Sequence, residues 1–373
     1  MRLTVAICPD STMIYPEGAG HLWAYLSWAV ALRDLGVEIV WVEGVLPGRS
    51  ADHATAAREH RERLARLGIE TEIALFAWNG DELDEVDGCV PLERVHEADL
   101  LLNFSYGMPA SVVDACRRSA LVDIDPGLLQ RWMAAGEIQV AQYDVYFTIG
   151  ETVGTQAARF PDCGIRWHRV ARPVHLAAWP FVPAPPDAPY TTVSHWWGDE
   201  WMAINGTMFN NDKRSGFLDY LDLPAATSAR LELALLTDDA DEIAGLERRG
   251  WRFRNAWDVA RTPEAYRDYI VGSRGEFSCA KPSCRLLANA WISDRTLCYL
   301  ASGRPAIVEH TGESRLLPDR EGLFRFRSPA EAAQALEQVE ADYDRHARAA
   351  RALAEEHFDA VRILRGVLET ALA

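Results

Sequence analysis

Residues 299–312 read YLASGRPAIVEHTG, and this stretch combines a helix end, a turn and a strand in direct succession. Gly303 is a helix stop, and Pro305 prevents the helix from continuing because it lacks a backbone N–H donor. The apolar residues 306–308 then predict a buried strand, which leads into the polar turn 309–312. In an open α/β sheet, a turn in this position borders the ligand-binding crevice at the carboxyl ends of the strands.

The same alternation of short apolar runs and longer segments of helical period extends outward through the chain, and it is typical of parallel sheets wrapped by helices. In the first half we expect strands at 3–8, 37–42, 70–76, 99–104, 121–124 and 145–149, the last closing the sheet, and helices at 21–35, 51–67 and 111–118. In the second half we expect strands at 191–194, 231–235 and 306–308, helices at 214–221, 263–271 and 293–302, and an almost wholly helical tail from 329 to 372.

A dense run of prolines separates the two halves. Pro180, Pro183, Pro185, Pro186 and Pro189 fix φ and remove backbone donors, so neither a helix nor a central strand can persist there. A length of 373 residues also favours two domains. We therefore expect a first domain at 1–180, a linker at 181–189 and a second domain at 190–350, with the ligand in the cleft between the two sheets.

Composition limits the possible partners. Lys plus Arg is 38 and Asp plus Glu is 55, which gives a formal net charge of −17 that repels nucleic acid. No apolar run is long enough to span a membrane, and the amino terminus lacks a signal-peptide core. The 7 cysteines are odd in number, without CxxC spacing, and no His/Cys pattern indicates a metal site. We therefore expect a cytoplasmic protein with reduced thiols and no bound metal.

Two segments upstream of the 299–312 stretch have features of an anion site. Ser293 is a candidate N-cap, and Asp294, Arg295 and Thr296 follow it at a helix start whose backbone N–H groups suit a diphosphate. Residues 273–281 read SRGEFSCAK and place Arg274, Glu276 and Lys281 close together in the chain. Taken alone, that second group is equally a solvated charge cluster.

Together these motifs resemble the donor-binding domain of GT-B glycosyltransferases. The stretch ASGRPAIV at 301–308 resembles their small-residue–Gly–x–Pro–Val turn. Residues 266–312 look more closely like a bacterial group that carries SRGEFS-x-AK, SDRS and YLASGRPVV in this order. The resemblance implies two Rossmann-like domains facing each other across a cleft, with a carboxyl-terminal helix at 351–373 returning to the first domain. It also implies that the second domain holds a nucleotide diphosphate sugar, as a co-substrate rather than a cofactor.

The sequence departs from the wider superfamily at the donor site. The carboxylate that often binds the donor ribose would fall near Cys298, and Asp294 is a candidate substitute. Pro282 and Cys284 stand where related chains more often carry polar and aromatic residues. We therefore expect an unusual donor or an unusual orientation of it.

The expected donor site unites the cationic, hydroxyl and turn residues of the second domain. Residues 210–214 (NNDKR) belong to it because cations at a helix start oppose the macrodipole and indicate a nearby anion, although a polar loop with Asp212 as N-cap explains them equally well. Transfer needs no metal if Arg274, Lys281 and the helix start neutralise the leaving diphosphate. The expected donor residues are Lys213, Arg214, Arg274, Glu276, Lys281, Ser293, Asp294, Arg295, Thr296, His310, Thr311 and Gly312.

In the first domain, Gly18-Ala19-Gly20-His21 lies between the first strand and the first helix and is not a GxGxxG motif. The arrangement resembles the amino-terminal domain of GT-B enzymes, in several families of which a histidine here is the general base toward the acceptor. A helix-capping or phosphate-contacting histidine is the alternative, and the carboxylates near it are candidates to orient or replace it. These are Asp10, Asp123, Asp125 and Glu151.

The expected acceptor contacts are Gly20, Trp23 and Asp125, of which Asp125 also suits a simple turn. The aromatic first helix hints at an apolar acceptor and at natural-product biosynthesis, although core packing explains the same residues. The resulting hypothesis is a glycosyltransferase acting on a small molecule. The alternatives are a nucleotide-sugar epimerase on the same scaffold and a hinged two-lobe solute-binding protein. The sequence leaves open the nucleobase, the sugar, the acceptor, the stereochemical outcome and the oligomeric state.

Overall fold

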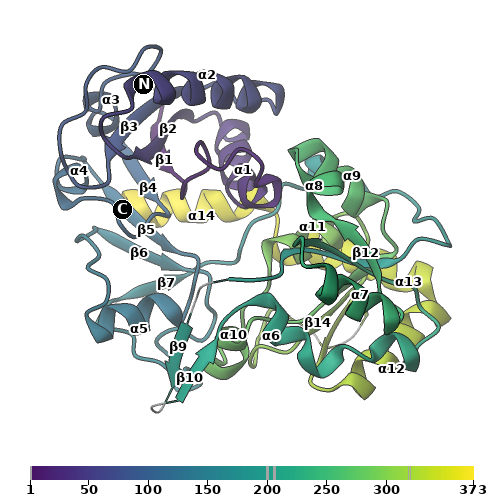
Figure 1. Cartoon of the computed structure of the whole chain (residues 1–373). Helices are drawn as coiled ribbons and strands as arrows, with labels where there is room; N and C mark the ends of the chain where they lie inside the picture. The colour runs from purple at the N-terminus through teal and green to yellow at the C-terminus, as the bar shows by residue number, and fades with distance from the viewer. Residues whose placement is uncertain (1, 199–200, 205–206, 318, 320) are drawn as a thin grey trace. The chain divides into compact units, whose positions relative to one another are not determined.

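The computed structural model describes residues 2–198, 201–204, 207–317, 319 and 321–373, and the chain forms two compact units (Figure 1). Unit 1 contains Met1–Gly154, Phe160–His175 and Ala360–Ala373, and unit 2 contains Thr155–Arg159 and Leu176–Asp359. The proline-rich segment 181–189 therefore lies within unit 2, and the chain leaves unit 1 after His175. The reason is a contact on each side of this boundary. His175 lies 2.8 Å from Asp34, in unit 1, whereas Trp179 is buried against Tyr266, in unit 2.

Unit 1 is built on a seven-stranded sheet in the order β3-β2-β1-β4-β5-β6-β7, and its neighbouring strands pair in parallel. β6 was expected to close this sheet, but Tyr146 of β6 pairs with Trp167 of β7, so that expectation is wrong. No sequence pattern predicts β7, because this strand is only 3 residues long and reads WHR. The strands are β1 (Thr4–Cys8), β2 (Glu38–Val45), β3 (Glu72–Ala77), β4 (Leu100–Asn103), β5 (Ser119–Asp123), β6 (Val145–Thr148) and β7 (Trp167–Arg169).

The first and the last helix of the chain, α1 and α14, both belong to unit 1. α1 packs against both β2 and α14, and Figure 1 shows α14 in yellow beside α1. α14 begins at Ala360, so residues 351–357, expected to start the returning helix, instead end α13 in unit 2. The helices are α1 (Ala19–Asp34), α2 (Ser50–Arg66), α3 (Glu93–His96), α4 (Ala110–Asp114), α5 (Leu128–Ala135) and α14 (Ala360–Leu372).

Unit 2 has a six-stranded sheet in the order β12-β11-β8-β13-β14-β15, again with parallel neighbours. Its core is aromatic, and Phe277 of β13 stacks on Phe326 of β15 with ring centroids 5.3 Å apart. A separate antiparallel hairpin joins β9 (Trp201–Ile204) to β10 (Thr207–Asn210). The sheet strands are β8 (Tyr190–His195), β11 (Leu231–Leu236), β12 (Arg252–Asn255), β13 (Gly275–Ser278), β14 (Ala306–Glu309) and β15 (Leu323–Phe326).

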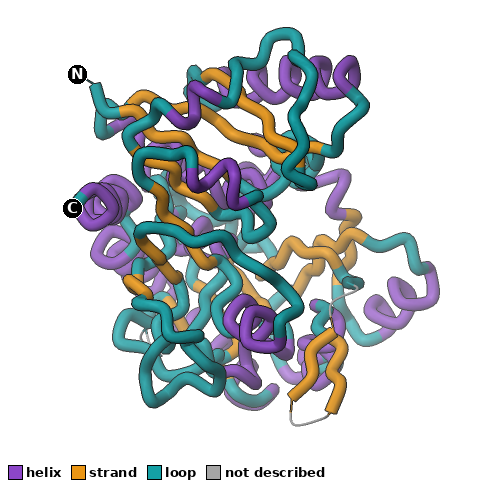
Figure 2. The backbone as a smooth tube through the Cα atoms, turned by 90° about the vertical axis from the view of Figure 1, so that its left-hand side faces the viewer, coloured by secondary structure: helices purple, strands orange, loops and turns teal. Residues whose placement is uncertain are grey.

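Most helices of unit 2 begin after a side chain that caps them, such as Thr262 before α9, Ser293 before α11 and Ser328 before α12, each of which accepts a backbone N–H. In Figure 2 the strands of both units gather into sheets bordered by helices. The helices are α6 (Lys213–Phe217), α7 (Ala240–Arg248), α8 (Ala256–Ala260), α9 (Pro263–Val271), α10 (Pro282–Leu287), α11 (Asp294–Ala301), α12 (Pro329–Ala341) and α13 (Tyr343–His357). Three short 3-10 turns occupy Leu176–Ala178, Leu218–Tyr220 and Leu223–Ala226.

The stretch at 299–312 folds as expected. α11 ends at Ala301, Gly303 has a φ of 68°, and β14 begins at Ala306. The predicted fold class, two parallel α/β sheets with helices, is confirmed. Within the described part of the chain, every helix is too short or too polar to traverse a bilayer.

Gly322 allows α13 to approach the start of β15 closely. Its φ is 82°, and a Cβ at this position would lie 2.3 Å from the backbone nitrogen of Ala350. The backbone of α13 cannot rotate away from an added Cβ as a side chain can. We therefore expect Gly322→Ala to lower the free energy of unfolding by more than about 1 kcal/mol and to lower Tm by several degrees. Thermal unfolding followed by circular dichroism measures this. Gly366→Ala on α14, where nothing lies within 4 Å, is the control and should keep or raise Tm. Equal midpoints for both variants would contradict the close approach.

Candidate functional site

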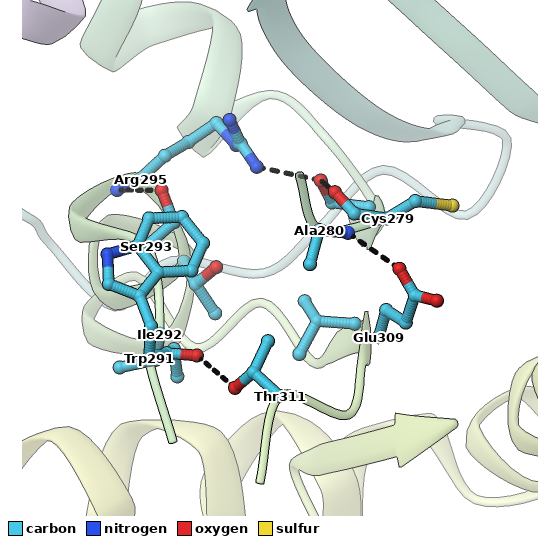
Figure 3. Close-up of a pocket in the computed structure, with 11 residues that line it drawn as sticks. Cys279, Ala280, Trp291, Ile292, Ser293, Arg295, Glu309 and Thr311 are labelled. Carbon is cyan, nitrogen blue, oxygen red and sulfur yellow. Dashed lines mark hydrogen bonds between the residues drawn. The ribbon is translucent and has the colours of Figure 1, made fainter. Parts of the chain in front are cut away.

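A small niche opens at the carboxyl edge of the unit 2 sheet, beside the point where the strand order reverses. β8 pairs with β11 on one side and with β13 on the other, which makes the β8/β13 boundary the topological switch point. The niche has a volume of 20 Å³ and is lined by residues from three segments that converge on it (Figure 3). They are Ser278, Cys279 and Ala280 after β13, Trp291, Ile292, Ser293, Arg295 and Thr296 around the start of α11, and Val308, Glu309 and Thr311 at the end of β14.

A buried ion pair lies at this niche. Arg295 donates from Nε to Glu276 at 2.7 Å, from Nη1 to the Val193 carbonyl at 3.0 Å and from Nη2 to Ser278 Oγ at 2.8 Å. Burial acts to lower the pKa of Arg295, but the Glu276 carboxylate outweighs this effect and raises it. Arg295 lines the niche, whereas Glu276 is fully buried behind it. The pair therefore fixes the start of α11 to β8 and β13, and Glu276 reaches a ligand only through Arg295.

Lys213 is a second buried cation beside the pair. Its Nζ donates to Ser278 Oγ at 3.1 Å and also to the Cys279 carbonyl. Burial lowers the pKa of Lys213 to about 8, and Arg295 acts in the same direction. At pH 7 this lysine remains mostly protonated, so positive charge is concentrated behind the niche.

Arg214 follows Lys213 in the chain, but its side chain contacts other residues. Its Nε donates to Glu242, and its guanidinium lies 5.2 Å from the centre of the Trp197 ring. Asp212 caps α6 by accepting the Ser215 N–H at 2.7 Å, as the polar-loop alternative expects. The structure therefore brings Lys213, and not Arg214, to the predicted donor site.

Ser293 caps α11 as expected, with its Oγ accepting the Arg295 N–H at 3.3 Å. Thr311 donates to the Trp291 carbonyl at 2.6 Å and so ties the end of β14 to the loop before α11. In that loop Ala288 and Ala290 have φ of 52° and 55°, a left-handed conformation that costs an alanine about 1–2 kcal/mol. Residues in unfavourable backbone conformations often cluster at functional sites, and these two lie in the loop that leads to the niche. The sequence did not indicate them, because alanine ordinarily adopts other conformations.

A larger pocket of 440 Å³ shares Glu309 with the niche. Glu309 accepts the Ala280 N–H at 2.9 Å and pairs with Arg285 at 3.1 Å, while burial raises its pKa. His310 accepts the Gly312 N–H at Nδ1, and burial, with Arg325 and Arg327, lowers the pKa of its ring. Its Nε2 is buried without a hydrogen-bond partner among the described residues. The pocket is lined by Ala157, Arg159, Arg285, Ala288, Glu309, His310, Gly312, Glu313 and Arg327.

Six of the expected donor residues line neither cavity: Lys213, Arg214, Arg274, Glu276, Lys281 and Asp294. Arg274 precedes β13, at the opposite edge of the sheet from Ser278, and donates to both Glu340 oxygens at 2.9 Å while its guanidinium lies 3.4 Å from the Tyr343 ring centre. Arg274 thus holds α12 and α13, which corrects its expected place at the donor. Lys281 is the N-cap residue of α10 and Asp294 the first residue of α11, and neither lines the niche or the larger pocket.

In unit 1 the strand order reverses between β1 and β4, and His21 lies in the first turn of α1 beside that point. Its Nε2 donates to the Asp10 carbonyl, which leaves Nδ1 with the free lone pair in the neutral ring. The Tyr25 ring meets the imidazole edge-on at 5.2 Å. Burial raises the pKa of Tyr25, and the charges of Asp10 and Asp125 act in the same direction. His21, Asp10 and the exposed Asp125 therefore gather at one edge of the sheet.

The other expected acceptor residues have different environments. Trp23 is 5 % exposed and packs in the core of unit 1, so it is removed from the acceptor set. Gly20 lies within α1 rather than ahead of it. Asp123 is buried and accepts from Gln130 and Thr148, both at 2.7 Å, and burial raises its pKa to about 6. This carboxylate joins β5, α5 and β6 and is not available as a base.

Glu43, near the end of β2, forms a buried cluster with residues of the loop that follows β1. Its Oε1 accepts from Thr12 Oγ1, from Trp41 Nε1 at 2.9 Å and from the Met13 N–H at 3.2 Å. Burial raises the pKa of Glu43 to about 7. The carboxyl group therefore pins the loop between β1 and α1, which also carries Asp10.

Comparison of the sequence with protein-family models and with curated proteins finds no match. Solved structures resemble the chain over its whole length. Sucrose-phosphate synthase from Thermosynechococcus elongatus is 11 % identical, with 99 % of this chain and 98 % of that chain covered and a TM-score of 0.59. An α-glucosyltransferase in complex with UDP and a 13-mer DNA is 11 % identical, with both chains fully covered and a TM-score of 0.58. Anabaena HepE in complex with UDP-glucose is 13 % identical, with 99 % of each chain covered and a TM-score of 0.54. At this identity the likeness shows the fold, which is the GT-B fold.

The pKa of Glu43 makes the stability of unit 1 depend on pH. A carboxyl group with a pKa of about 7 when folded and 4.5 when unfolded stabilises the fold fully below pH 4.5, and this contribution is lost as pH rises through 7. We expect Glu43→Gln to remove a decline of up to about 3 kcal/mol between pH 4.5 and 8. Chemical denaturation at a series of pH values measures it, with Glu38→Gln at the other end of β2 as control. Parallel pH profiles for wild type and Glu43→Gln would contradict the assignment.

Proposed function

We propose that the protein is a glycosyltransferase that moves a sugar from a nucleotide diphosphate sugar, bound by unit 2, to a small-molecule acceptor, bound by unit 1. The observation that carries the proposal is the niche at the switch point of unit 2, where a capped helix start meets the buried cations Lys213 and Arg295. The GT-B structures that the chain resembles support it, since HepE is described with UDP-glucose and the α-glucosyltransferase with UDP.

The proposed donor site carries excess positive charge, which favours a departing diphosphate. The N-terminus of α11 has partial positive charge, and Lys213 adds to it because Glu276 balances only Arg295. Preorganised cations of this kind stabilise negative charge that develops as the glycosidic bond to the donor breaks. We propose that these groups neutralise the leaving group without a metal ion. The pocket of 440 Å³ beyond Glu309 would hold the remainder of the donor, against His310 and Gly312.

On the acceptor side we propose His21 as the general base. Because Nε2 donates to the Asp10 carbonyl, Nδ1 is the nitrogen that would accept the proton of the acceptor hydroxyl. That oxygen would then attack the anomeric carbon as the nucleotide diphosphate departs. An acceptor without a polyphosphate backbone agrees with the net charge of −17. AviGT4, described as involved in avilamycin A biosynthesis, is 13 % identical with a TM-score of 0.55 and supports a natural-product acceptor. The comparisons do not favour the epimerase or the solute-binding alternative.

The donor assignment is tested by nucleotide binding. We expect at least one nucleoside diphosphate to raise Tm, and Lys213→Met to weaken its binding about tenfold, because the buried cation beside the niche is lost. Isothermal titration calorimetry measures both. Arg274→Ala is the control: it should lower Tm by releasing Glu340 but leave nucleotide affinity unchanged. The absence of any nucleotide-dependent shift in the wild type would contradict the proposed function.

The base assignment is tested by turnover. We expect His21→Ala to lower kcat by about a hundredfold or more while donor affinity stays nearly constant, since a general base acts in the chemical step. Release of nucleotide diphosphate from the donor in the presence of acceptor reports the rate, and Asp125→Asn is assayed in parallel. If His21→Ala keeps near-normal turnover and Asp125→Asn loses turnover, Asp125 rather than His21 is the general base. Loss of donor binding in His21→Ala would make the histidine a phosphate contact.

A further inference from the structure

Unit 1 contains a pocket of 380 Å³ formed between three strand ends and α2. Met13, Ile14 and Pro16 follow β1, Val45 and Leu46 lie at the end of β2, and Trp78 follows β3. The opposite wall is formed by the residue before α2 and by one face of α2 along most of its length, with Arg49, Asp52, His53, Ala56, Glu59 and Arg63. A volume of this size lies within the range of small-molecule sites.

The strand side of the pocket presents apolar side chains to solvent. Ile14 is 55 % exposed and Leu46 is 64 % exposed, so two of the few large hydrophobic residues that the described part of unit 1 exposes line one cavity. The Trp78 indole is held edge-on against Phe76 at 4.9 Å, and it lies so close over Gly44 that a Cβ there would be 2.3 Å from the ring. A rigid indole beside exposed aliphatic groups is a suitable surface for a ring-containing ligand.

The helix side of the pocket is polar but has no net charge. The two guanidinium groups of Arg49 and Arg63 are matched by the carboxylates of Asp52 and Glu59. Burial lowers the pKa of His53, which favours the neutral form of its ring, and this residue lines the pocket. An uncharged hydrogen-bonding group is therefore available to a ligand hydroxyl, whereas an anionic ligand would find no excess of positive charge.

The pocket shares a loop with the proposed base. Asp10 accepts the His21 N–H, and the Tyr15 ring centroid lies 6.1 Å from that of His21. Ile14 and Pro16, on either side of Tyr15, line the pocket. A ligand in this pocket therefore lies against the segment that positions His21.

We propose that this pocket binds the acceptor, and that the acceptor is an uncharged, largely apolar, ring-containing molecule with at least one hydroxyl group. This inference rests on the proposed function and names the substrate class of its acceptor site. It also replaces the expected apolar contact through Trp23, which is buried in the core. Apolar burial against Ile14, Leu46 and Trp78 would supply the affinity, and His53 would contribute a hydrogen bond.

The test is direct binding without a donor. Naringenin and estradiol serve as uncharged ring-containing probes, and fructose 6-phosphate and methyl α-glucoside as anionic and polar probes, with saturation-transfer NMR as readout. We expect naringenin or estradiol to bind, and Leu46→Glu to weaken that binding at least tenfold, because it places a charge on the apolar wall. Leu372→Glu, exposed in the same unit but outside the pocket, is the matched control and should bind as the wild type does. Since both residues are exposed, neither change should prevent folding, and Tm confirms this.

The outcomes separate this inference from the proposed function. Absence of binding by both ring-containing probes, equal binding by Leu46→Glu and wild type, or preference for fructose 6-phosphate would each overturn the acceptor pocket. Probe binding that depends on Leu46, in a protein that neither binds a nucleoside diphosphate nor transfers a sugar, would leave the pocket as an apolar binding site and reject the glycosyltransferase. Transfer to ring-containing acceptors that Leu46→Glu slows through KM, with kcat unchanged, would support both.

Discussion

The contact between the Arg295 guanidinium and the Glu276 carboxylate joins the parts of unit 2 on which the candidate donor site depends. One arginine uses its planar set of donors to reach β13 through Glu276 and Ser278 and β8 through the Val193 carbonyl. Loss of one partner would leave the other charge buried and uncompensated, at a cost of about 3–5 kcal/mol. The start of α11 is therefore held in place by electrostatics as well as by packing, and Lys213 joins the same network through Ser278.

Unit 1 uses a buried carboxyl group at the corresponding edge of its sheet, with a different electrostatic consequence. Glu276 faces a permanent cation, whereas Glu43 accepts from the neutral donors of Thr12, Trp41 and Met13. Neutral donors do not compensate for burial, so the pKa of Glu43 rises to about 7. Both arrangements immobilise a segment that carries site residues. In unit 2 the segment is a helix start, and in unit 1 it is the loop that supports His21.

The two proposed binding regions differ in the chemistry that they offer. In unit 2, positive charge is concentrated locally in a protein whose net charge is −17, which allows a small anion to bind while extended polyanions are repelled. In unit 1, the pocket balances its charges and exposes Ile14 and Leu46, which favours an uncharged partner. This division suits the proposed reaction between a charged donor and an uncharged acceptor.

Local sequence determined the features that depend on neighbouring residues in the chain. The end of α11 at Gly303, the strand after Pro305, the Ser293 cap and the parallel α/β class all follow from steric limits and hydrogen bonding within a few positions. Tertiary structure decided which side chains meet. Arg274 and Ser278 are close in sequence, but a strand between them carries them to opposite edges of the sheet, so only the latter reaches the niche. The apolar pocket of unit 1 joins the ends of three strands that are far apart in the chain, and no local pattern records such a meeting because parallel pairing creates it.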